Sequence, residues 1–375
     1  MKQKRICIDI NSIVPLFVRG YVSGVGRTTL ELVEALADVK EDLPFEIVLY
    51  SQNMKGIGGR NLNLPFKNKH LYFPHRENYD KFLGKYPIRE IFTRYDLLHI
   101  PHNFEYVYCP EKIIVTLHDA LFMKFQEKFF NHERMKLEVP PLMHKCKAII
   151  TCSKSSKEDI VETMNVDPEK IHVIPWGIRH DIFFPEYDSE ILERKFGLKK
   201  AYFFSIPCSD ERKNTPMLID AYIELCKNNP ENDLCLIWDA PQYIREKINY
   251  LGVQNRIHLL KNIDNNDLRV LYSGATATVF PSMYEGFGLP VLESMACGTP
   301  VITSNTSSLP EVGGNAAIYI DPADKLSILN AMMLFENNVV DKAALSEKGV
   351  EHAFTYTWDK CARATLGVYQ KYLND

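Results

Sequence analysis

Short β-rich runs alternate with helical patterns along almost the whole sequence of 375 residues. This alternation is typical of parallel sheets built from βαβ units, in which the helix after each strand covers the sheet. The sequence therefore predicts an α/β protein. The runs expected to be strands are 5–10, 46–50, 97–100, 112–117, 148–153 and 171–175 in the first half, and 201–206, 233–239, 256–260, 275–282, 299–304 and 316–321 in the second.

A polar break at 180–198 separates these two series of strands. A chain of this length is also longer than one hydrophobic core usually serves. We therefore predict two doubly wound, Rossmann-like domains, residues 1–180 and 181–355, that face one another across a cleft. Residues 358–373 have the apolar spacing of an amphipathic helix at the end of the sequence. In open parallel sheets ligands bind beyond the carboxyl ends of the strands, so the loops that follow strands should carry the chemistry.

Charge and cysteine content argue against several classes of protein. The net charge is only -4, so general nucleic-acid binding is not expected. The start MKQKRICIDI has no apolar signal core, and no segment reaches about 18 consecutive apolar residues. The nine cysteines form no C-x-x-C pair and mostly lie in apolar runs, as reduced core residues do. We therefore expect a cytoplasmic protein.

The charge is distributed unevenly along the chain. Residues 1–180 hold 26 Lys and Arg against 22 Asp and Glu, or +4, and the remainder holds 18 against 26, or -8. Within the first half, the stretch 67–94 carries seven basic and three acidic residues, with aromatic residues between them. Two interpretations remain open: a solvated helical face, or a weak patch for anionic lipid or an anionic acceptor. The second would place the protein peripherally at the inner face of a membrane.

The segment FPSMYEGFGLPVLESMACGTPVI, residues 280–302, holds two carboxylates eight positions apart, Glu285 and Glu293. The predicted strand at 275–282 ends within this segment, so residues 283–286 should lie at its carboxyl end. Pro290 suits the first turn of a helix, and Gly298 can end that helix. We therefore expect a glycine-rich turn that leads into a short helix.

The turn before this helix, residues 286–289, should present backbone N–H groups to a phosphate, because the start of a helix binds anions. Its glycines let a ligand approach the backbone closely. The two glutamates can reach opposite sides of such a phosphate, and a carboxylate accepts hydrogen bonds from vicinal hydroxyl groups. A sugar, a phosphate and a ribose in this order make up a nucleotide-sugar.

The run EGFGLPVLE resembles the E-x7-E motif of retaining glycosyltransferases with the GT-B fold. Residues 280–322 as a whole are similar to glycosyltransferase family 4, in particular to bacterial polysaccharide glycosyltransferases. The resemblance covers most of the chain. It also includes SGVGRTTLELVEAL (23–36), TLHDA (116–120), VIPWGI (173–178), ERKN (211–214) and the closing helix, about 356–375, which in that fold packs back on the first domain.

The resemblance implies a hexosyltransferase whose second domain binds the nucleotide-sugar donor. Glu293 would bind the ribose hydroxyl groups, and Glu285 would bind the hydroxyl groups of the transferred sugar. The backbone of Phe287, Gly288 and Leu289 would meet the diphosphate.

Arg212 and Lys213 would supply positive charge to that diphosphate. A departing nucleoside diphosphate becomes more negative in the transition state, so fixed cations stabilise it selectively. The chain contains no D-x-D motif, which other glycosyltransferases use to hold a metal. No metal and no other cofactor is therefore expected. One departure concerns Pro207, which stands where many members of the family have glycine.

In the first half, His118 follows the strand at 112–117. It is either a hydrogen-bonded histidine at a strand end, with Asp119 as a helix cap, or, as the resemblance favours, a group that faces the donor sugar. Gly24 and Gly26 lie in a loop that lacks the G-x-x-x-x-G-K-[ST] pattern of NTPases. They are expected to bring the first helix close to the donor phosphate or the acceptor.

The preferred interpretation is a retaining transferase that moves a hexose from a nucleotide-sugar to a hydroxyl of a glycan or lipid-linked glycan. The segments TLHDA and RKN are similar to branches of this family that build bacterial surface polysaccharide, many of which use GDP-mannose, so the resemblance favours that pathway and that donor. Two alternatives share much of the phosphate chemistry: a nucleotide-sugar 2-epimerase and a non-catalytic module that binds sugar nucleotides.

Overall fold

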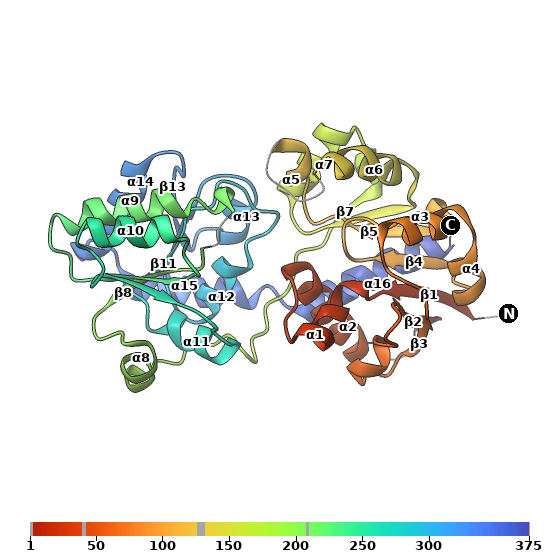
Figure 1. Ribbon diagram of the computed structural model, residues 1–375, viewed down its shortest axis with the longest axis horizontal. Helices are drawn as coiled ribbons and strands as arrows, with labels where there is room; N and C mark the ends of the chain where they lie inside the picture. The colour runs from red at the N-terminus through yellow and green to blue at the C-terminus, as the bar shows by residue number, and fades with distance from the viewer. Residues whose placement is uncertain (1–2, 40–42, 126–131, 208–209, 375) are drawn as a thin grey trace. The chain divides into compact units, whose positions relative to one another are not determined.

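The structure, a computed structural model, describes residues 3–39, 43–125, 132–207 and 210–374 (Figure 1). The chain divides into two compact units. The N-terminal unit comprises Met1–Gly177 and Trp358–Asp375, and the C-terminal unit comprises Ile178–Thr357. Each unit is built around one parallel sheet, so the predicted pair of doubly wound α/β folds is confirmed.

The sheet of the N-terminal unit has seven strands in the order β3-β2-β1-β4-β5-β6-β7, and all neighbours pair in parallel. Its central strands consist mainly of buried aliphatic residues, as a sheet covered on both faces requires. The strands are β1 (Lys4–Asp9), β2 (Phe45–Gln52), β3 (Lys67–Leu71), β4 (Leu97–Ile100), β5 (Ile113–Thr116), β6 (Ala148–Thr151) and β7 (Ile171–Val173).

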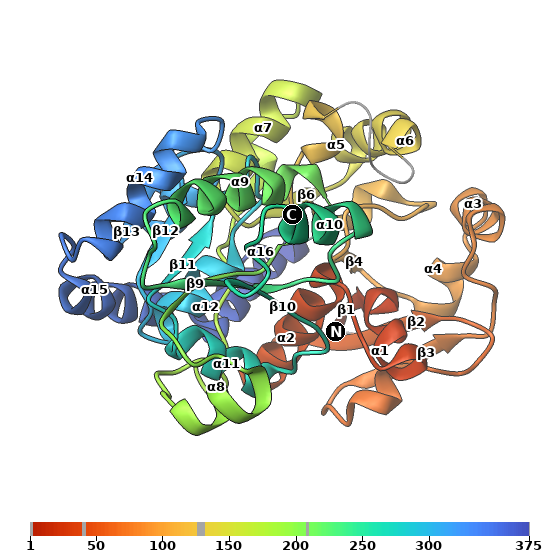
Figure 2. The same ribbon diagram turned by 60° about the vertical axis from the view of Figure 1, so that its left-hand side comes forward.

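Helices cover both faces of this sheet. The apolar sides of α2 and α16 meet in one core, where Leu32, Leu36, Ala362 and Tyr369 are buried, and the two helices lie side by side in Figures 1 and 2. The helices of the unit are α1 (Val14–Arg19), α2 (Gly24–Asp38), α3 (Glu77–Lys85), α4 (Ile88–Thr93), α5 (Leu121–Lys124), α6 (His132–Lys145), α7 (Lys154–Met164) and α16 (Trp358–Asn374).

The sheet of the C-terminal unit has six parallel strands in the order β10-β9-β8-β11-β12-β13. The strands are β8 (Tyr202–Ser205), β9 (Asp233–Ile237), β10 (Ile257–Leu260), β11 (Ala277–Phe280), β12 (Val301–Ser304) and β13 (Ala317–Ile320). The helices are α8 (Ser189–Phe196), α9 (Thr215–Cys226), α10 (Gln242–Tyr250), α11 (Asn265–Ser273), α12 (Leu289–Ala296), α13 (Leu309–Gly313), α14 (Lys325–Glu336) and α15 (Lys342–Phe354). Helices α9 and α14 pack together over one core, and α8 lies beside α11 (Figure 2).

Each sheet has one point at which the chain changes direction. In the N-terminal unit the chain runs outward from β1 through β2 and β3, then returns to β4 on the other side of β1. In the C-terminal unit it runs from β8 through β9 and β10, then returns to β11 beside β8. Ligands of such folds bind beyond the carboxyl ends of the two strands that flank this switch point. The loops after β1 and β4, and those after β8 and β11, are therefore the places to look for binding residues.

The first interpretation of the basic stretch 67–94 was a solvated helical face, but only part of the stretch is helical. Residues Lys67–Leu71 form the edge strand β3, and α3 and α4 follow it. Arg89, one of its seven basic residues, is only 1% exposed and belongs to the interior. Of the nine cysteines, Cys208 lies outside the described residues. Within the described ranges, no helix combines the length and apolar character needed to cross a bilayer.

Candidate active site

The predicted turn and helix of the E-x7-E segment are both present. Strand β11 ends at Phe280 and α12 begins at Leu289, with Pro290 in its first turn. Gly288 caps the helix with a φ of 121°, and a Cβ there would lie 2.9 Å from Leu309 Cδ2. Gly298 follows the end of the helix with a φ of 75°. Only glycine adopts the conformation of Gly288 without strain, so the loop that carries Glu285 depends on it.

Arg212, Lys213 and Glu285 meet at the switch point of the C-terminal sheet. Arg212 Nη1 donates to Glu285 Oε2 at 2.9 Å, and Lys213 Nζ donates to Glu285 Oε1 at 2.6 Å. Arg212 Nε also donates to Asp210 Oδ2 at 2.8 Å. The two cations come from the short 3-10 helix η5 (Glu211–Lys213) after β8, and Glu285 comes from the loop after β11. The chain thus places two positive and two negative charges beside the start of α12.

The charges in this group support one another. Burial disfavours the ionised form of Glu285, but Lys213 and Arg212 outweigh burial and hold the pKa of Glu285 below its usual range. Burial likewise disfavours the Arg212 cation, whereas Glu285 and Asp210 raise its pKa. Glu285 and Arg212 are therefore both charged at neutral pH, and their ion pair holds the Arg212 cation in a fixed position.

Serine hydroxyl groups fix the loop that carries Glu285. Ser282 Oγ donates to Glu285 Oε1 at 2.6 Å, and Glu285 N donates to Ser307 Oγ at 3.0 Å. Ser308 Oγ donates to the carbonyl oxygens of Glu285 and Phe287 at 2.9 and 2.6 Å. The sequence reasoning missed these serines. Ser282 lies within the segment 280–302 but was given no role there, and the only signal of Ser307 and Ser308 was the run TSS at 306–308, which follows β12 at the same edge of the sheet.

Glu293 lies inside α12 and is only 2% exposed. Tyr272 OH, at the end of α11, donates to Glu293 Oε2 at 3.2 Å. Phe287 is also buried, and its ring packs edge-on against Tyr356 at a centroid distance of 6.0 Å. The segment between the glutamates is thus an integral part of the unit, with Leu289 partly exposed at the start of the helix.

In the N-terminal unit His118 is buried in the loop after β5. Its Nε2 lies 3.1 Å from the carbonyl oxygen of Pro101, and its ring packs against Trp176 with a centroid distance of 5.0 Å. Burial lowers the pKa of His118 to about 4, so its imidazole is neutral at neutral pH. His118 and Trp176 line a small cavity of about 20 Å³, to which Thr28 and Thr365 also contribute.

Comparison with known proteins agrees with this geometry. Residues 22–182 match the family model described as Glycosyltransferase Family 4, and residues 188–352 match the model described as Glycosyl transferases group 1. The chain belongs to the family 4 glycosyltransferases with the GT-B fold. It is therefore an enzyme that transfers glycosyl groups, and it is built from two parallel-sheet α/β units.

Two curated relatives and one solved structure illustrate the likeness. O-antigen chain mannosyltransferase B of Escherichia coli is 26% identical over 93% of this chain and 96% of its own. O-antigen chain mannosyltransferase RfbU of Salmonella typhimurium is 30% identical over 59% of this chain and 60% of its own. The fold also matches that of Anabaena Alr3699/HepE, solved in complex with UDP and glucose, with a TM-score of 0.72, 17% identity, and coverage of 98% of this chain and 100% of that chain.

The glycosyltransferase brings some predicted residues together. Arg212, Lys213 and Glu285 are in direct contact at the carboxyl edge of one sheet. Phe287, Gly288, Leu289 and Glu293 follow Glu285 in the same loop and helix. His118, Gly24 and Gly26 belong to the other unit. The roles proposed for all of these residues in binding and catalysis stay predictions.

Gly24 and Gly26 open α2 and differ sharply in their surroundings. Ser23 caps the helix by accepting a hydrogen bond from Gly26 N at 3.2 Å. A Cβ on Gly26 would lie 2.3 Å from the carbonyl oxygen of Ser12, whereas a Cβ on Gly24 would meet nothing within 4 Å. Close packing of α2 against the short 3-10 helix η1 (Asn11–Ile13) therefore requires Gly26 whether or not a ligand binds nearby.

We expect Gly26→Ala to lower the free energy of unfolding by about 1–3 kcal/mol, as overpacking of a tight contact usually does. Gly24→Ala is the matched control, and it should leave stability unchanged or raise it slightly because alanine favours a helix. Urea unfolding of both variants, monitored by circular dichroism, measures the difference. Equal stability of the two variants would contradict the packing assigned to Gly26.

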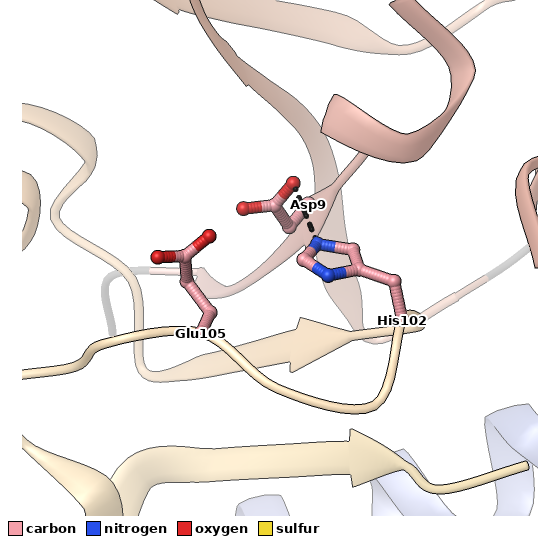
Figure 3. A group of neighbouring side chains, drawn as sticks. All are labelled: Asp9, His102 and Glu105. Atoms are coloured by element: carbon pink, nitrogen blue, oxygen red, sulfur yellow. Dashed lines mark ion pairs between the residues drawn. The ribbon is translucent and has the colours of Figure 1, made fainter. Parts of the chain in front are cut away.

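Sequence reasoning also missed three groups at the switch point of the N-terminal sheet (Figure 3). Asp9 ends β1, and His102 and Glu105 lie in the loop after β4. His102 Nε2 is 3.2 Å from Asp9 Oδ1, and one ligand atom from each of the three residues lies within 4.8 Å of the others. Asp9 and Glu105 are buried, whereas 13% of the His102 side chain is exposed.

The three groups contain atoms that ligate metals, but their surroundings do not favour a divalent cation. The guanidinium of buried Arg89 lies 3.7 Å from Glu105 Oε1. Burial lowers the pKa of His102, but Asp9 outweighs burial and raises it above its usual range, so a proton competes for the imidazole. A divalent cation would thus enter a site that already holds the Arg89 guanidinium and a proton on His102.

Proposed function

We propose that this glycosyltransferase transfers mannose from GDP-mannose, with retention of configuration, to a hydroxyl of a glycan or lipid-linked glycan in surface polysaccharide synthesis. The proposal is supported by the relatives of Escherichia coli and Salmonella typhimurium, whose names describe O-antigen mannosyltransferases. The contact of Arg212 and Lys213 with Glu285 at the switch point beside α12 is the observation that carries it.

The donor is proposed to bind the C-terminal unit with its diphosphate at Arg212, Lys213 and the start of α12. Helix starts attract phosphate, and the two fixed cations add charge without any movement when the reaction occurs. Glu285 would bind hydroxyl groups of the transferred sugar, and Glu293 those of the ribose. Positive charge from Arg212, Lys213 and the start of α12 would stabilise the departing diphosphate, so the proposed reaction needs no metal.

In the N-terminal unit, neutral His118 is proposed to act toward the donor sugar as a hydrogen-bonding group rather than as a charge. Its lowered pKa supports this, because an imidazole with a pKa of about 4 does not carry a proton at neutral pH. Gly24 and Gly26 would let the start of α2 approach the phosphate or the acceptor.

A thermal-shift screen of GDP-, UDP-, ADP- and dTDP-sugars tests the donor assignment. A ligand that binds only the native state raises stability by about 2.7 kcal/mol at a concentration of 100 times Kd, which corresponds to a shift of roughly 5–10 °C. GDP-mannose is expected to produce this shift, and Lys213→Gln is expected to reduce it. If only UDP-sugars produce a shift, the donor is a UDP-sugar and the assignment of GDP-mannose is wrong. If none of the sugar nucleotides produces a shift, the proposal is contradicted.

We also propose that α3, α4 and β3 contact an anionic membrane surface. Large apolar side chains of this region are exposed, and exposed basic side chains accompany them. The apolar residues are Tyr72, Tyr79, Phe82, Tyr86, Ile91 and Phe92, and the exposed basic residues are Lys67, Arg76, Lys85 and Arg94. Aromatic rings suit the boundary between lipid and water, and basic groups are attracted to anionic headgroups.

Binding to vesicles that contain phosphatidylserine is expected to weaken steeply with salt, because the attraction fades beyond a Debye length of roughly 8 Å at physiological ionic strength. Lys85→Gln combined with Arg94→Gln should weaken binding by about 2 kcal/mol, at about 1 kcal/mol per basic residue. Lys227→Gln, at an exposed lysine of the C-terminal unit, is the matched control. Vesicle co-sedimentation measures the effect, and binding that ignores salt and lipid charge would contradict the contact.

A further inference from the structure

The group Asp9, His102 and Glu105 occupies the position at which an open parallel sheet binds its ligands. Asp9 ends β1, and the other two residues follow β4, the strand that pairs with β1 across the switch point. None of the donor-binding residues discussed above contributes to this group. The N-terminal sheet thus carries a second set of chemically active side chains at its own switch point.

Hydrogen bonds from polar neighbours hold Asp9 in place. Asn11 N and Asn11 Nδ2 donate to the two oxygens of Asp9 at 2.8 and 3.1 Å. Gln52 N donates to Asn11 Oδ1 at 2.7 Å, so the end of β2 fixes the asparagine in turn. Each oxygen of Asp9 therefore has a donor, and the carboxylate keeps a single orientation toward His102.

Glu105 is fixed from the other side. Tyr106 N donates to Glu105 Oε1 at 3.0 Å, and Arg89 Nη2 lies 3.7 Å from the same oxygen. Arg89 is buried, and within the described part of the chain its Nε and Nη2 have no hydrogen-bond partner. Arg89 lies in α4, its Nη1 donates to the carbonyl oxygen of Tyr106 at 3.1 Å, and its guanidinium lies over the Tyr50 ring at 5.5 Å. These contacts hold a buried cation beside Glu105, where a carboxyl partner offsets part of the cost of burying the charge.

His102 is the member of the group that reaches solvent. Its Nε2 faces Asp9, and Figure 3 shows the second ring nitrogen on the side of the ring away from Asp9. An imidazolium in this position offers a donor to an incoming group, and the nearby Glu105 carboxyl offers an acceptor. A sugar hydroxyl both donates and accepts hydrogen bonds, so adjacent sugar hydroxyl groups suit this pair of side chains.

We propose that Asp9, His102 and Glu105 form an acceptor subsite, in which His102 donates to and Glu105 accepts from hydroxyl groups of the acceptor sugar. Asp9 is a positioning residue that orients His102 and balances its charge. This inference rests on the proposed transfer to a glycan hydroxyl. It assigns the recognition of that glycan to three named residues.

The ionisation of the group is consistent with this division of roles. Burial lowers the pKa of His102, and so does His75, but Asp9 and Glu105 outweigh both and raise it. Burial disfavours the charge on Asp9, and His102 and Arg89 keep its pKa low. Burial raises the pKa of Glu105 against the effect of Arg89. His102 therefore stays a donor, and a carboxyl oxygen of Glu105 accepts a hydrogen bond in either protonation state.

Nuclear magnetic resonance of the histidine side chains tests the subsite without any donor present. The full chain is titrated with p-nitrophenyl α-D-mannopyranoside as the probe, and the signals are assigned with His102→Gln and His172→Gln. His172 lies on the far edge strand β7 and is the matched control. The His102 signal is expected to move saturably, and the His172 signal should stay in place. An unmoved His102 signal at the highest soluble probe concentration overturns the proposal.

A parallel titration with MnCl2 separates a hydroxyl subsite from a cation site. Paramagnetic broadening confined to His102, at metal concentrations far below those of the probe, would identify a cation site and overturn the hydroxyl assignment. No selective broadening is expected, because the Arg89 guanidinium and the proton on His102 disfavour a cation at this position.

Turnover provides the second readout. His102→Gln and Glu105→Gln are each expected to lower kcat/KM for transfer to the mannoside by roughly 10- to 100-fold, mainly through KM, as loss of a hydrogen bond to a charged group does. Hydrolysis of GDP-mannose without the probe should fall less than transfer to the mannoside does, because the proposed contacts are with the acceptor. Equal loss of both activities, or an unchanged KM, would overturn the subsite. Failure of the wild-type protein to hydrolyse or transfer from GDP-mannose would contradict the donor proposal instead, while the probe titration still decides the subsite.

Discussion

Arg212→Gln and Lys213→Gln are each expected to lower kcat by a factor of about 10²–10³, which corresponds to roughly 3–4 kcal/mol. Both cations are fixed beside Glu285 at the switch point, where the departing diphosphate is proposed to lie. The diphosphate is more negative as the glycosidic bond breaks than in the intact donor, so the transition state should lose more than the bound substrate. Donor Kd should therefore change less than kcat.

Single-turnover rates at saturating donor, measured beside direct titration of the donor, check this expectation. The double variant should lose less than the product of the two single losses, because both residues act on one diphosphate. Lys227→Gln is the control for a lysine that pairs with a carboxylate on the surface. Thermal unfolding of each variant checks the fold, since removing one partner of a buried pair also destabilises it. A loss confined to Kd would show that the cations bind only the ground state.

Glu285→Gln is expected to separate sugar binding from diphosphate binding. The carboxylate accepts hydrogen bonds from both cations, so its removal leaves them free to bind phosphate oxygens more strongly. The affinity for free nucleoside diphosphate should rise about tenfold, or about 1.4 kcal/mol. Transfer should fall roughly 10- to 100-fold, because hydrogen bonds from the sugar to a charged carboxylate are lost.

Isothermal titration with GDP and steady-state transfer rates measure the two effects on one preparation of Glu285→Gln. Glu224→Gln, at a surface carboxylate that pairs with Lys227, is the matched control and should change neither quantity. Weaker binding of GDP by Glu285→Gln would mean that the carboxylate mainly organises the two cations. In that case its proposed contact with the sugar would lose its support.

The sequence predicted the fold class because each buried strand is a short β-rich run, and the alternation with helices left few topologies open. It did not predict β3. Residues 67–71, KNKHL, are mostly polar, and β3 is an edge strand with no fully buried residue. Such a strand lacks the apolar alternation on which the prediction relied. Its backbone pairing with β2, and not its own sequence pattern, stabilises the extended conformation.

For the candidate site, sequence reasoning found residues within recognisable segments and missed those that only the sheet order brings together. Glu285 was found because its loop contains two glycines and a proline in a distinctive pattern. Asp9 and His102 are far apart in the sequence, and nothing near either of them indicates a partner. Their contact follows from the pairing of β1 with β4, which a single sequence does not reveal.

The most direct test of the account is to incubate the wild-type protein with radiolabelled GDP-mannose and a membrane fraction that carries lipid-linked glycan, and to follow nucleotide and sugar together. The wild-type protein should release GDP in step with the appearance of α-linked mannose in the glycan, and Lys213→Gln should lower this rate by a factor of about 10²–10³ under the same conditions. Conversion of the sugar without release of GDP would indicate an epimerase. Binding of the nucleotide-sugar with neither release nor conversion would indicate a non-catalytic module, and either result would contradict the account.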